Sequence, residues 1–185
     1  MGDRDKHLCP VERAGSLDNK LRKCLQNPYK ILGPYLREGM QVLDLGCGPG
    51  FFSIPIAEMV GPSGRVIAAD VQEGMLQKVR EKIKGIELEK RVTLHKCQDE
   101  KINLLEKVDF ILLFYMVHEV PNQEVFFKEI ETILKPDGQV YIVEPPFHVS
   151  KKDFEKMVQT AHNFSFVEKI RPKMLFNKAV ILQKI

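Results

Sequence analysis

The chain has 185 residues, of which 44% are hydrophobic and 29% charged, and its formal net charge is +3 at pH 7. This composition is typical of one soluble globular domain with a substantial core. The longest apolar runs, such as residues 110–117, are far too short to cross a membrane, and the polar N-terminus has no apolar signal core. We therefore expect a cytoplasmic protein with no membrane partner.

The four cysteines and the distribution of charge exclude other classes of site. No pair of cysteines forms a Cys-x-x-Cys unit, so the sequence indicates neither a zinc site nor a disulfide framework. The lysines are mostly mixed with glutamates, as in residues 81–87, which is typical of a solvated helix face. A nucleic-acid partner is disfavoured on this ground, although RNA stays open as an alternative acceptor.

Apolar spacing predicts the secondary structure in chain order. After a polar tail, the leucines between Leu17 and Leu36 predict two short helices that lie across a sheet, with a break near Asn27 and Pro28. The Lys-Pro-Asp-Gly sequence at residues 135–138 predicts a turn. The remaining patterns predict strands at residues 41–45, 66–69, 91–96, 108–114, 139–144, 164–169 and 178–183, and helices at residues 50–60, 72–86, 122–134 and 151–161.

The order of these elements predicts the topology. Strands that alternate with helices imply parallel pairing and right-handed crossovers. The last two strands are separated by about eight non-helical residues and should pair antiparallel. We expect a single α/β domain at residues 39–185, preceded by a tail and cap helices at residues 1–38.

The most informative segment, residues 42–50, reads Val-Leu-Asp-Leu-Gly-Cys-Gly-Pro-Gly between a predicted strand and a predicted helix. Glycine lets a backbone turn tightly and lets a ligand lie against it. In open α/β sheets, ligands bind at such loops, outside the carboxyl ends of the strands. The G-x-G-x-G spacing differs from the dinucleotide fingerprint, whose third glycine would stand at Phe51, and no Lys-Ser or Lys-Thr follows as in a P-loop.

This loop resembles motif I of class I S-adenosylmethionine-dependent methyltransferases, (D/E)-x-G-x-G-x-G, and the likeness extends over residues 40–144. The Leu-Lys-Pro-Asp-Gly sequence at residues 134–138 is similar to a late motif of small methyltransferases of the ubiquinone/menaquinone-biosynthesis and arsenite types. The resemblance implies a Rossmann-like, doubly wound, mostly parallel seven-stranded sheet with a C-terminal antiparallel hairpin. It also implies S-adenosylmethionine as cofactor and S-adenosylhomocysteine as product. The scattered cysteines predict no metal.

Asp70 closes the second predicted strand, 24 residues after Gly46. A carboxylate there can accept hydrogen bonds from both hydroxyls of a ribose, as the acid of the dinucleotide fold does. The alternative role is that of a helix N-cap. Val71 would flank adenine, and Met75 would either cover one adenine face or belong to the buried stripe of its helix.

Other residues receive cofactor roles from the resemblance. The acid after the third strand, Asp99, would accept from the adenine amino group, with Gln98 orienting its loop; Phe114 would pack near the methionyl part. Asp44 would fix the glycine loop, face the ligand's ammonium group, or do both, and Cys47 suits a crowded backbone through its small size. The predicted cofactor-binding residues are Asp44, Gly46, Cys47, Gly48, Gly50, Asp70, Val71, Met75, Gln98, Asp99 and Phe114.

Tyr115 and His118, in the segment that leaves the fourth strand, are the predicted catalytic residues. Histidine has the right pKa for a base near neutrality. Orientation alone can supply much of the acceleration of a methyl transfer, however, so a plain loop histidine is the alternative. Further residues could contact the acceptor or cover the site, or simply pack: Tyr29, Tyr35, Glu144 and His148.

The predicted function is methyl transfer from S-adenosylmethionine to an unidentified small molecule, by a monomer or homodimer. Two alternatives stay open. One is an NAD(P)-dependent oxidoreductase with an unusual glycine loop, and the other is a non-catalytic protein that binds S-adenosylmethionine.

Overall fold

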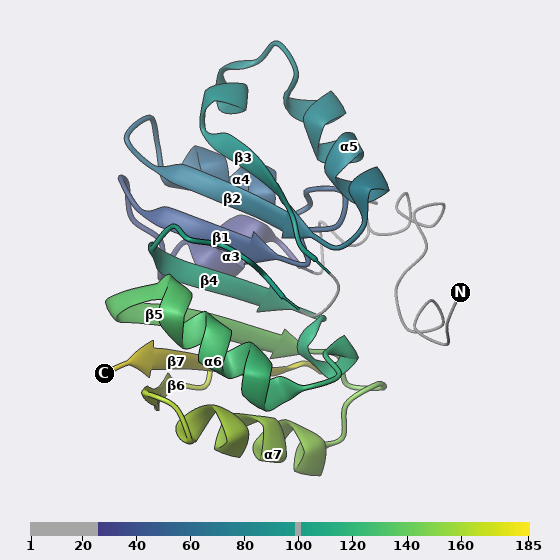
Figure 1. The fold of residues 1–185 in the computed structure, drawn as a ribbon, viewed down its shortest axis with the longest axis vertical. Helices are drawn as coiled ribbons and strands as arrows, with labels where there is room; N and C mark the ends of the chain where they lie inside the picture. Colours follow the sequence, from purple (N-terminus) through teal and green to yellow (C-terminus); the bar gives the residue numbers. More distant parts are fainter. Residues whose placement is uncertain (1–25, 99–100) are drawn as a thin grey trace.

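The computed structural model describes residues 26–98 and 101–185. One seven-stranded sheet in the order β3-β2-β1-β4-β5-β7-β6 runs through it, and β7 alone is antiparallel to its neighbours (Figure 1). This arrangement confirms the predicted Rossmann-like fold with its C-terminal antiparallel hairpin. The strands are β1 (Gln41–Leu45), β2 (Arg65–Asp70), β3 (Val92–Lys96), β4 (Val108–Phe114), β5 (Leu134–Glu144), β6 (Phe166–Ile170) and β7 (Lys178–Lys184).

Helices cover both faces of the sheet, which is why its central strands are apolar throughout. In β1, Val42 points into one apolar cluster while Leu43 and Leu45 point into the other, because successive side chains of a strand alternate between faces. The first cluster receives α3 (Pro28–Leu32), α4 (Ser53–Met59) and α5 (Glu73–Ile83), and the second receives α6 (Gln123–Ile133) and α7 (Lys151–His162). In Figure 1, α6 and α7 lie in front of the sheet and α3 and α4 behind it.

Polar side chains fix where several helices begin. Asn122 accepts from the Val125 N–H at the start of α6, and Ser150 accepts from the Asp153 N–H at the start of α7. Asn27 does the same for α3, which is the second of the two helices predicted before residue 36. The first of those two helices lies outside the described residues. Short 3-10 helices, η3 (Glu87–Lys90) and η4 (Val117–Glu119), complete the regular structure of the described residues.

The prediction of a turn at residues 135–138 was wrong in one respect. The strand β5 begins at Leu134, which pairs with Val108, and the next pairing joins Phe110 to Gln139. Residues 135–138 therefore form a bulge inside the strand, with Asp137 in the left-handed region at a φ of 60°. Proline and glycine do mark irregular backbone here, but the pairing of Leu134 with β4 depends on a distant strand.

The described residues contain no helix long and apolar enough to cross a membrane.

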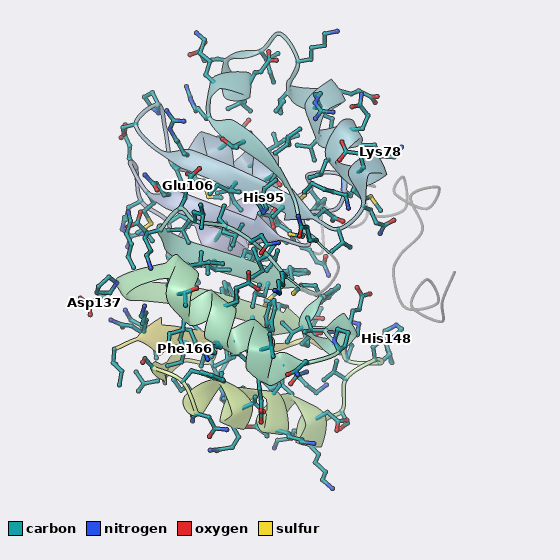
Figure 2. All side chains as sticks on the ribbon, viewed as in Figure 1. Lys78, His95, Glu106, Asp137, His148 and Phe166 are labelled. Carbon is teal, nitrogen blue, oxygen red and sulfur yellow. The ribbon has the colours of Figure 1, made fainter. Side chains whose placement is uncertain are left out.

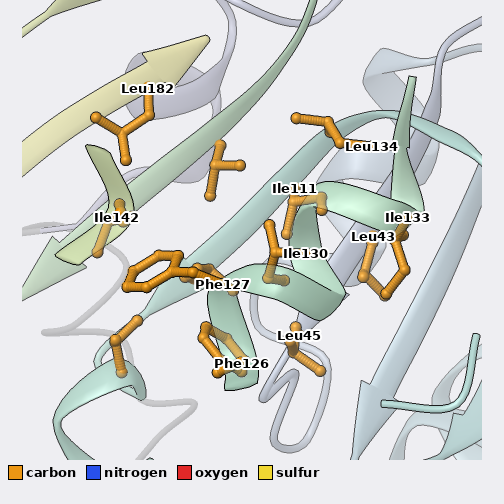
Figure 3. Close-up of a cluster of buried hydrophobic side chains, with 14 of the residues drawn as sticks. Leu43, Leu45, Ile111, Phe126, Phe127, Ile130, Ile133, Leu134, Ile142 and Leu182 are labelled. Atoms are coloured by element: carbon orange, nitrogen blue, oxygen red, sulfur yellow. The ribbon is translucent and has the colours of Figure 1, made fainter. Parts of the chain in front are cut away.

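Phe127, on the inner face of α6, lies at the centre of one apolar cluster (Figure 3) and is 0% exposed. Phe127→Ala should lower the free energy of unfolding by about 3–5 kcal/mol, because the substitution leaves a cavity in a close-packed core. Val125→Ala, on the same helix but 48% exposed, should change it by less than about 0.5 kcal/mol. Urea denaturation measures both, and equal effects of the two substitutions would contradict this description of the core.

Candidate functional site

The glycine loop between β1 and α4 has a backbone that only glycine adopts without strain. The φ angles of Gly46, Gly48 and Gly50 are 73°, 54° and 83°. The N–H groups of Gly46 and Cys47 both donate to the Ala69 carbonyl, at 2.8 and 3.0 Å. The loop therefore follows β1 in sequence and is also hydrogen-bonded to the end of β2.

Neighbouring elements pack closely on this loop. A Cβ atom built on Gly46 would lie 3.1 Å from the Cβ of Met116, and one built on Gly50 would lie 3.1 Å from a methyl group of Val79. Met116 directly follows the end of β4, and Val79 belongs to α5. The segment after β4 is thus in contact with the glycine loop, although the two are about 70 residues apart in sequence.

Asp44 is buried within β1, and its carboxylate accepts a 2.5 Å hydrogen bond from the Ser53 hydroxyl at the start of α4. This contact joins the strand before the glycine loop to the helix after it. A role in fixing the loop is therefore visible, and contact with a ligand's ammonium group stays a prediction.

Asp70 joins the two loops at the carboxyl ends of β1 and β2. One carboxylate oxygen accepts from the Gly48 N–H at 2.9 Å, and the other accepts from the Gln72 N–H at 2.8 Å. Burial raises the pKa of Asp70, while the hydrogen bonds from Gln72 and Gly48 and the charge of Lys96 oppose that rise. Since Gln72 is the N-cap of α5, Asp70 is not a simple N-cap. The Val71 N–H is a third backbone donor to this carboxylate, which offers about four acceptor positions, so room remains for one further donor.

The other residues predicted around an adenosyl group have varied environments. Met75 is fully buried on α5, which matches the packing alternative, while Val71 is half-buried. The Gln98 side chain accepts from the Asn103 amide at 2.9 Å. Asp99 lies outside the described residues. Burial raises the pKa of the Cys47 thiol well above its ordinary value, which disfavours the reactive thiolate.

Tyr115 connects three distant segments at the end of β4. Its hydroxyl donates to the Asn177 side chain at 2.6 Å and accepts from the Gln26 amide at 2.7 Å. Its backbone is left-handed, with a φ of 62°, which is unusual for a residue other than glycine. The Phe114 ring lies between those of Phe52 and Tyr115, with both centroid distances at 4.4 Å.

His118 and Glu144 form a pair that the sequence named separately but did not connect. His118 Nδ1 lies 2.6 Å from Glu144 Oε2, and the His118 backbone N–H donates to Glu144 Oε1 at 3.2 Å. The hydrogen bond with Glu144 raises the pKa of His118, against the effect of burial. The sequence signal was present, because the two residues follow or end neighbouring parallel strands.

Glu119 is an acid of this edge that the sequence reasoning missed. Burial raises the pKa of Glu119 to about 7, the charge of His118 opposes the rise, and the charges of Glu144 and Asp70 add to it. The charge of Asp70, at the end of β2, thus acts on Glu119 in the segment after β4. Asp44, Asp70, Glu119 and Glu144 together make this edge acidic.

The two tyrosines predicted near the entrance have packing partners. The Tyr29 hydroxyl donates to the Glu58 carboxylate, and Tyr35 packs edge-on against Tyr141 with ring centroids 5.5 Å apart. A covering role for them stays a prediction. Among residues 26–98 and 101–185, no three His, Cys, Asp or Glu side chains are grouped so that they could hold a metal ion.

A cleft of about 770 Å³ lies beside this edge, between the start of α7 and the β6–β7 loop. Its lining includes Lys151, Phe154, Arg171, Phe176 and Asn177. Asn177 also receives the hydrogen bond from the Tyr115 hydroxyl, so the cleft adjoins the end of β4. The loop after β5 leaves from the same side of the sheet, as the position of His148 in Figure 2 shows.

The order of the strands, the glycine loop and the acids at the strand ends are together typical of a Rossmann-like methyltransferase. Residues 36–179 match the family model described as a methyltransferase domain. The chain belongs to this methyltransferase-domain family, which confirms the resemblance to class I S-adenosylmethionine-dependent methyltransferases.

Individual relatives point the same way. The crystal structure of a SAM-dependent methyltransferase from Aquifex aeolicus superimposes with a TM-score of 0.86 at 29% identity, over 96% of this chain and 100% of that one. A demethylmenaquinone methyltransferase of Lactobacillus johnsonii is 34% identical over 136 residues, which are 70% of this chain and 55% of that protein. A ubiquinone/menaquinone biosynthesis C-methyltransferase of Haemophilus ducreyi is 27% identical, over 75% and 52%. The chain thus spans about half the length of these two curated relatives.

The contact between Gly46 and Met116 predicts a difference between two glycines of similar conformation. Gly85 has a φ of 74°, close to the 73° of Gly46, but a Cβ there would meet nothing within 4 Å. Gly85→Ala should therefore cost only backbone strain, about 1–2 kcal/mol. Gly46→Ala should cost about 1–3 kcal/mol more in urea denaturation, because the methyl group overlaps Met116.

Met116→Ala provides the control for that comparison. In its background the excess cost of Gly46→Ala over Gly85→Ala should largely disappear, because the overlapping atoms are gone. An excess that persists unchanged would show that Met116 does not restrict the space above Gly46.

Proposed function

We propose that the protein transfers a methyl group from S-adenosylmethionine to a small-molecule acceptor. The observation that carries the proposal is the hydrogen bond that joins Asp70 to Gly48 at the carboxyl ends of β1 and β2. It holds the Asp70 carboxylate, to which we assign the ribose diol, beside a loop of left-handed glycines, in the place where open α/β sheets bind ligands. Family membership supports the same activity.

The residues present fit the cofactor. The glycine loop would lie along its amino-acid end, Asp70 would accept from its ribose hydroxyls, and Val71 would flank its adenine. Phe114 would pack against its methionyl chain. Asp44 would face its ammonium group. When bound, S-adenosylmethionine supplies an electrophilic methyl group on a positively charged sulfur. The acidic side chains at this edge suit that charge, since opposite charges attract strongly where water is scarce.

The acceptor is the less defined partner. The two curated relatives carry names that place their substrates among quinones or in quinone biosynthesis. A small, partly aromatic acceptor would suit the ring of Tyr115 and the neighbouring cleft. We propose residues 39–185 as the unit that binds donor and acceptor, without help from a metal or a membrane.

Calorimetry with S-adenosylhomocysteine tests the role of Asp70. Asp70→Asn should weaken binding by about 1–3 kcal/mol, or roughly 10- to 100-fold, because one acceptor oxygen and the charge are lost. Glu73→Gln removes the same charge from a nearby side chain that is 60% exposed, and it should change affinity less than about twofold.

Equal effects of the two substitutions would contradict the assignment of Asp70 to the ribose. Thermal stabilisation by NAD but not by S-adenosylhomocysteine would instead contradict the proposed function and favour an oxidoreductase. Tight binding of the donor without transfer of a labelled methyl group to any metabolite in an extract would favour a non-catalytic binding protein.

The pKa of about 7 for Glu119 predicts a pH dependence of donor binding. Below pH 7 Glu119 is mostly protonated and neutral, and above it the side chain is a carboxylate that attracts the sulfonium. The ratio of S-adenosylmethionine to S-adenosylhomocysteine affinity should therefore rise about three- to tenfold from pH 6 to pH 8. Glu119→Gln should flatten this rise, and an identical rise in that variant would assign it to another group.

A further inference from the structure

The pairing of His118 with Glu144 is built more firmly than a loop contact would require. Glu144 is the last residue of β5, its side chain is 0% exposed, and it interacts with both the ring and the backbone of His118. A buried carboxylate is costly unless it is hydrogen-bonded. Both hydrogen bonds that offset this cost come from His118, so its imidazole is held in a defined orientation.

The contact also fixes the tautomer of the neutral ring. An ionised carboxylate only accepts hydrogen bonds, so Nδ1 must carry the hydrogen that lies between it and Glu144. In the neutral ring, Nε2 is then unprotonated and keeps a free lone pair. The His118 side chain is 25% exposed, whereas Glu144 is fully buried, so the accessible edge of the ring is the one that carries Nε2.

His118 lies at the same edge of the sheet as the glycine loop, to which we assign the methyl donor. It belongs to η4, which begins one residue after Met116, and Met116 packs on the glycine loop at Gly46. On its other side the His118 ring stacks on the His148 ring, with centroids 5.9 Å apart. His118 thus stands between the loop assigned to the donor and the residues that follow β5.

We propose that His118 is the catalytic base of this methyltransferase, with Glu144 as its positioning residue, and that the acceptor presents a hydroxyl group on an aromatic ring. This inference rests on the proposed function and adds to it a proton-accepting atom and a class of acceptor. An aromatic hydroxyl is mostly neutral near pH 7, so its oxygen becomes a strong nucleophile only when a base removes the proton. The rings of Tyr115 and His148, which are not buried, give such an acceptor flat surfaces to pack against.

Nε2 of His118 takes the proton from the acceptor's hydroxyl group, and the electron pair of that O–H bond remains on the oxygen. The oxygen forms a bond to the methyl carbon, and the electron pair of the broken carbon–sulfur bond stays on sulfur. The imidazolium is stabilised by the Glu144 carboxylate and later releases its proton to water.

Several charged or titratable groups act on His118. Glu144 reaches it from β5, Glu119 is its neighbour in η4, and His148 stacks on it from the loop after β5. Glu119 is influenced in turn by Asp70 at the end of β2. The hydrogen bond with Glu144 has the largest effect on the pKa of His118 and raises it. Glu144→Gln should therefore lower that pKa.

The first measurement needs no acceptor. The chain has five histidines, whose ring protons can be followed by NMR as the pH is changed. With His118→Asn to assign its resonance, this titration gives the pKa of His118 in the full chain. In Glu144→Gln this pKa should move to lower pH, while the affinity for S-adenosylhomocysteine and the melting temperature stay close to those of the wild type. An unchanged pKa would overturn the pairing.

The second measurement uses labelled S-adenosylmethionine with 1-naphthol and catechol as aromatic hydroxyl probes and cyclohexanol as an aliphatic one. The aromatic probes should be methylated and cyclohexanol should not. His118→Asn should lower kcat by about 100-fold or more without changing the KM for the donor, the scale of general-base catalysis. The matched control His162→Asn, on the exposed end of α7, should leave kcat unchanged.

The pH profile separates positioning from a merely structural role. The wild-type rate should rise with pH through the pKa of His118 and then level off. In Glu144→Gln the rise should begin at lower pH and reach a lower plateau. A slower variant whose profile keeps the wild-type midpoint, or a His118→Asn variant of normal kcat, would overturn the proposal.

Failure of the proposed function is a different outcome. It would appear as absent binding of both S-adenosylmethionine and S-adenosylhomocysteine. Intact donor binding with no methylation of either aromatic hydroxyl would overturn only the assignment of the base and its acceptor.

Discussion

The hydrogen bond from the Gly48 N–H to the Asp70 carboxylate is the contact on which the account of the site depends. It joins the loop after β1 to the end of β2 at 2.9 Å. Parallel pairing brings the carboxyl ends of these strands to one edge. The left-handed glycines then let the loop turn back far enough to reach that carboxylate. The pairing that forms the sheet therefore also brings together Gly48 and Asp70, the residues to which we assign the methyl donor.

Most of the fold could be predicted because its signals are local. Buried parallel strands read as unbroken apolar runs, and the helices between them have a clear apolar face. The bulge in β5 could not be predicted, because proline and glycine at residues 135–138 show irregular backbone but not that Leu134 already pairs with Val108. That pairing is set by the partner strand.

The candidate site divides in the same way. Its single residues were accessible from the sequence, since glycines and acids at strand ends have a known logic. Their partners were not, because the contact of His118 with Glu144 and that of Tyr115 with Asn177 join segments that only the sheet order brings together. Glu119 gave no signal of its own, since its raised pKa comes from burial and from the charges of other strands.

A crystal structure of the complex with S-adenosylhomocysteine tests the central claim most directly. In that complex both ribose hydroxyls should lie within about 3 Å of the Asp70 carboxylate oxygens, with the amino-acid end along the glycine loop. A ligand bound elsewhere, or a ribose turned away from Asp70, would contradict it.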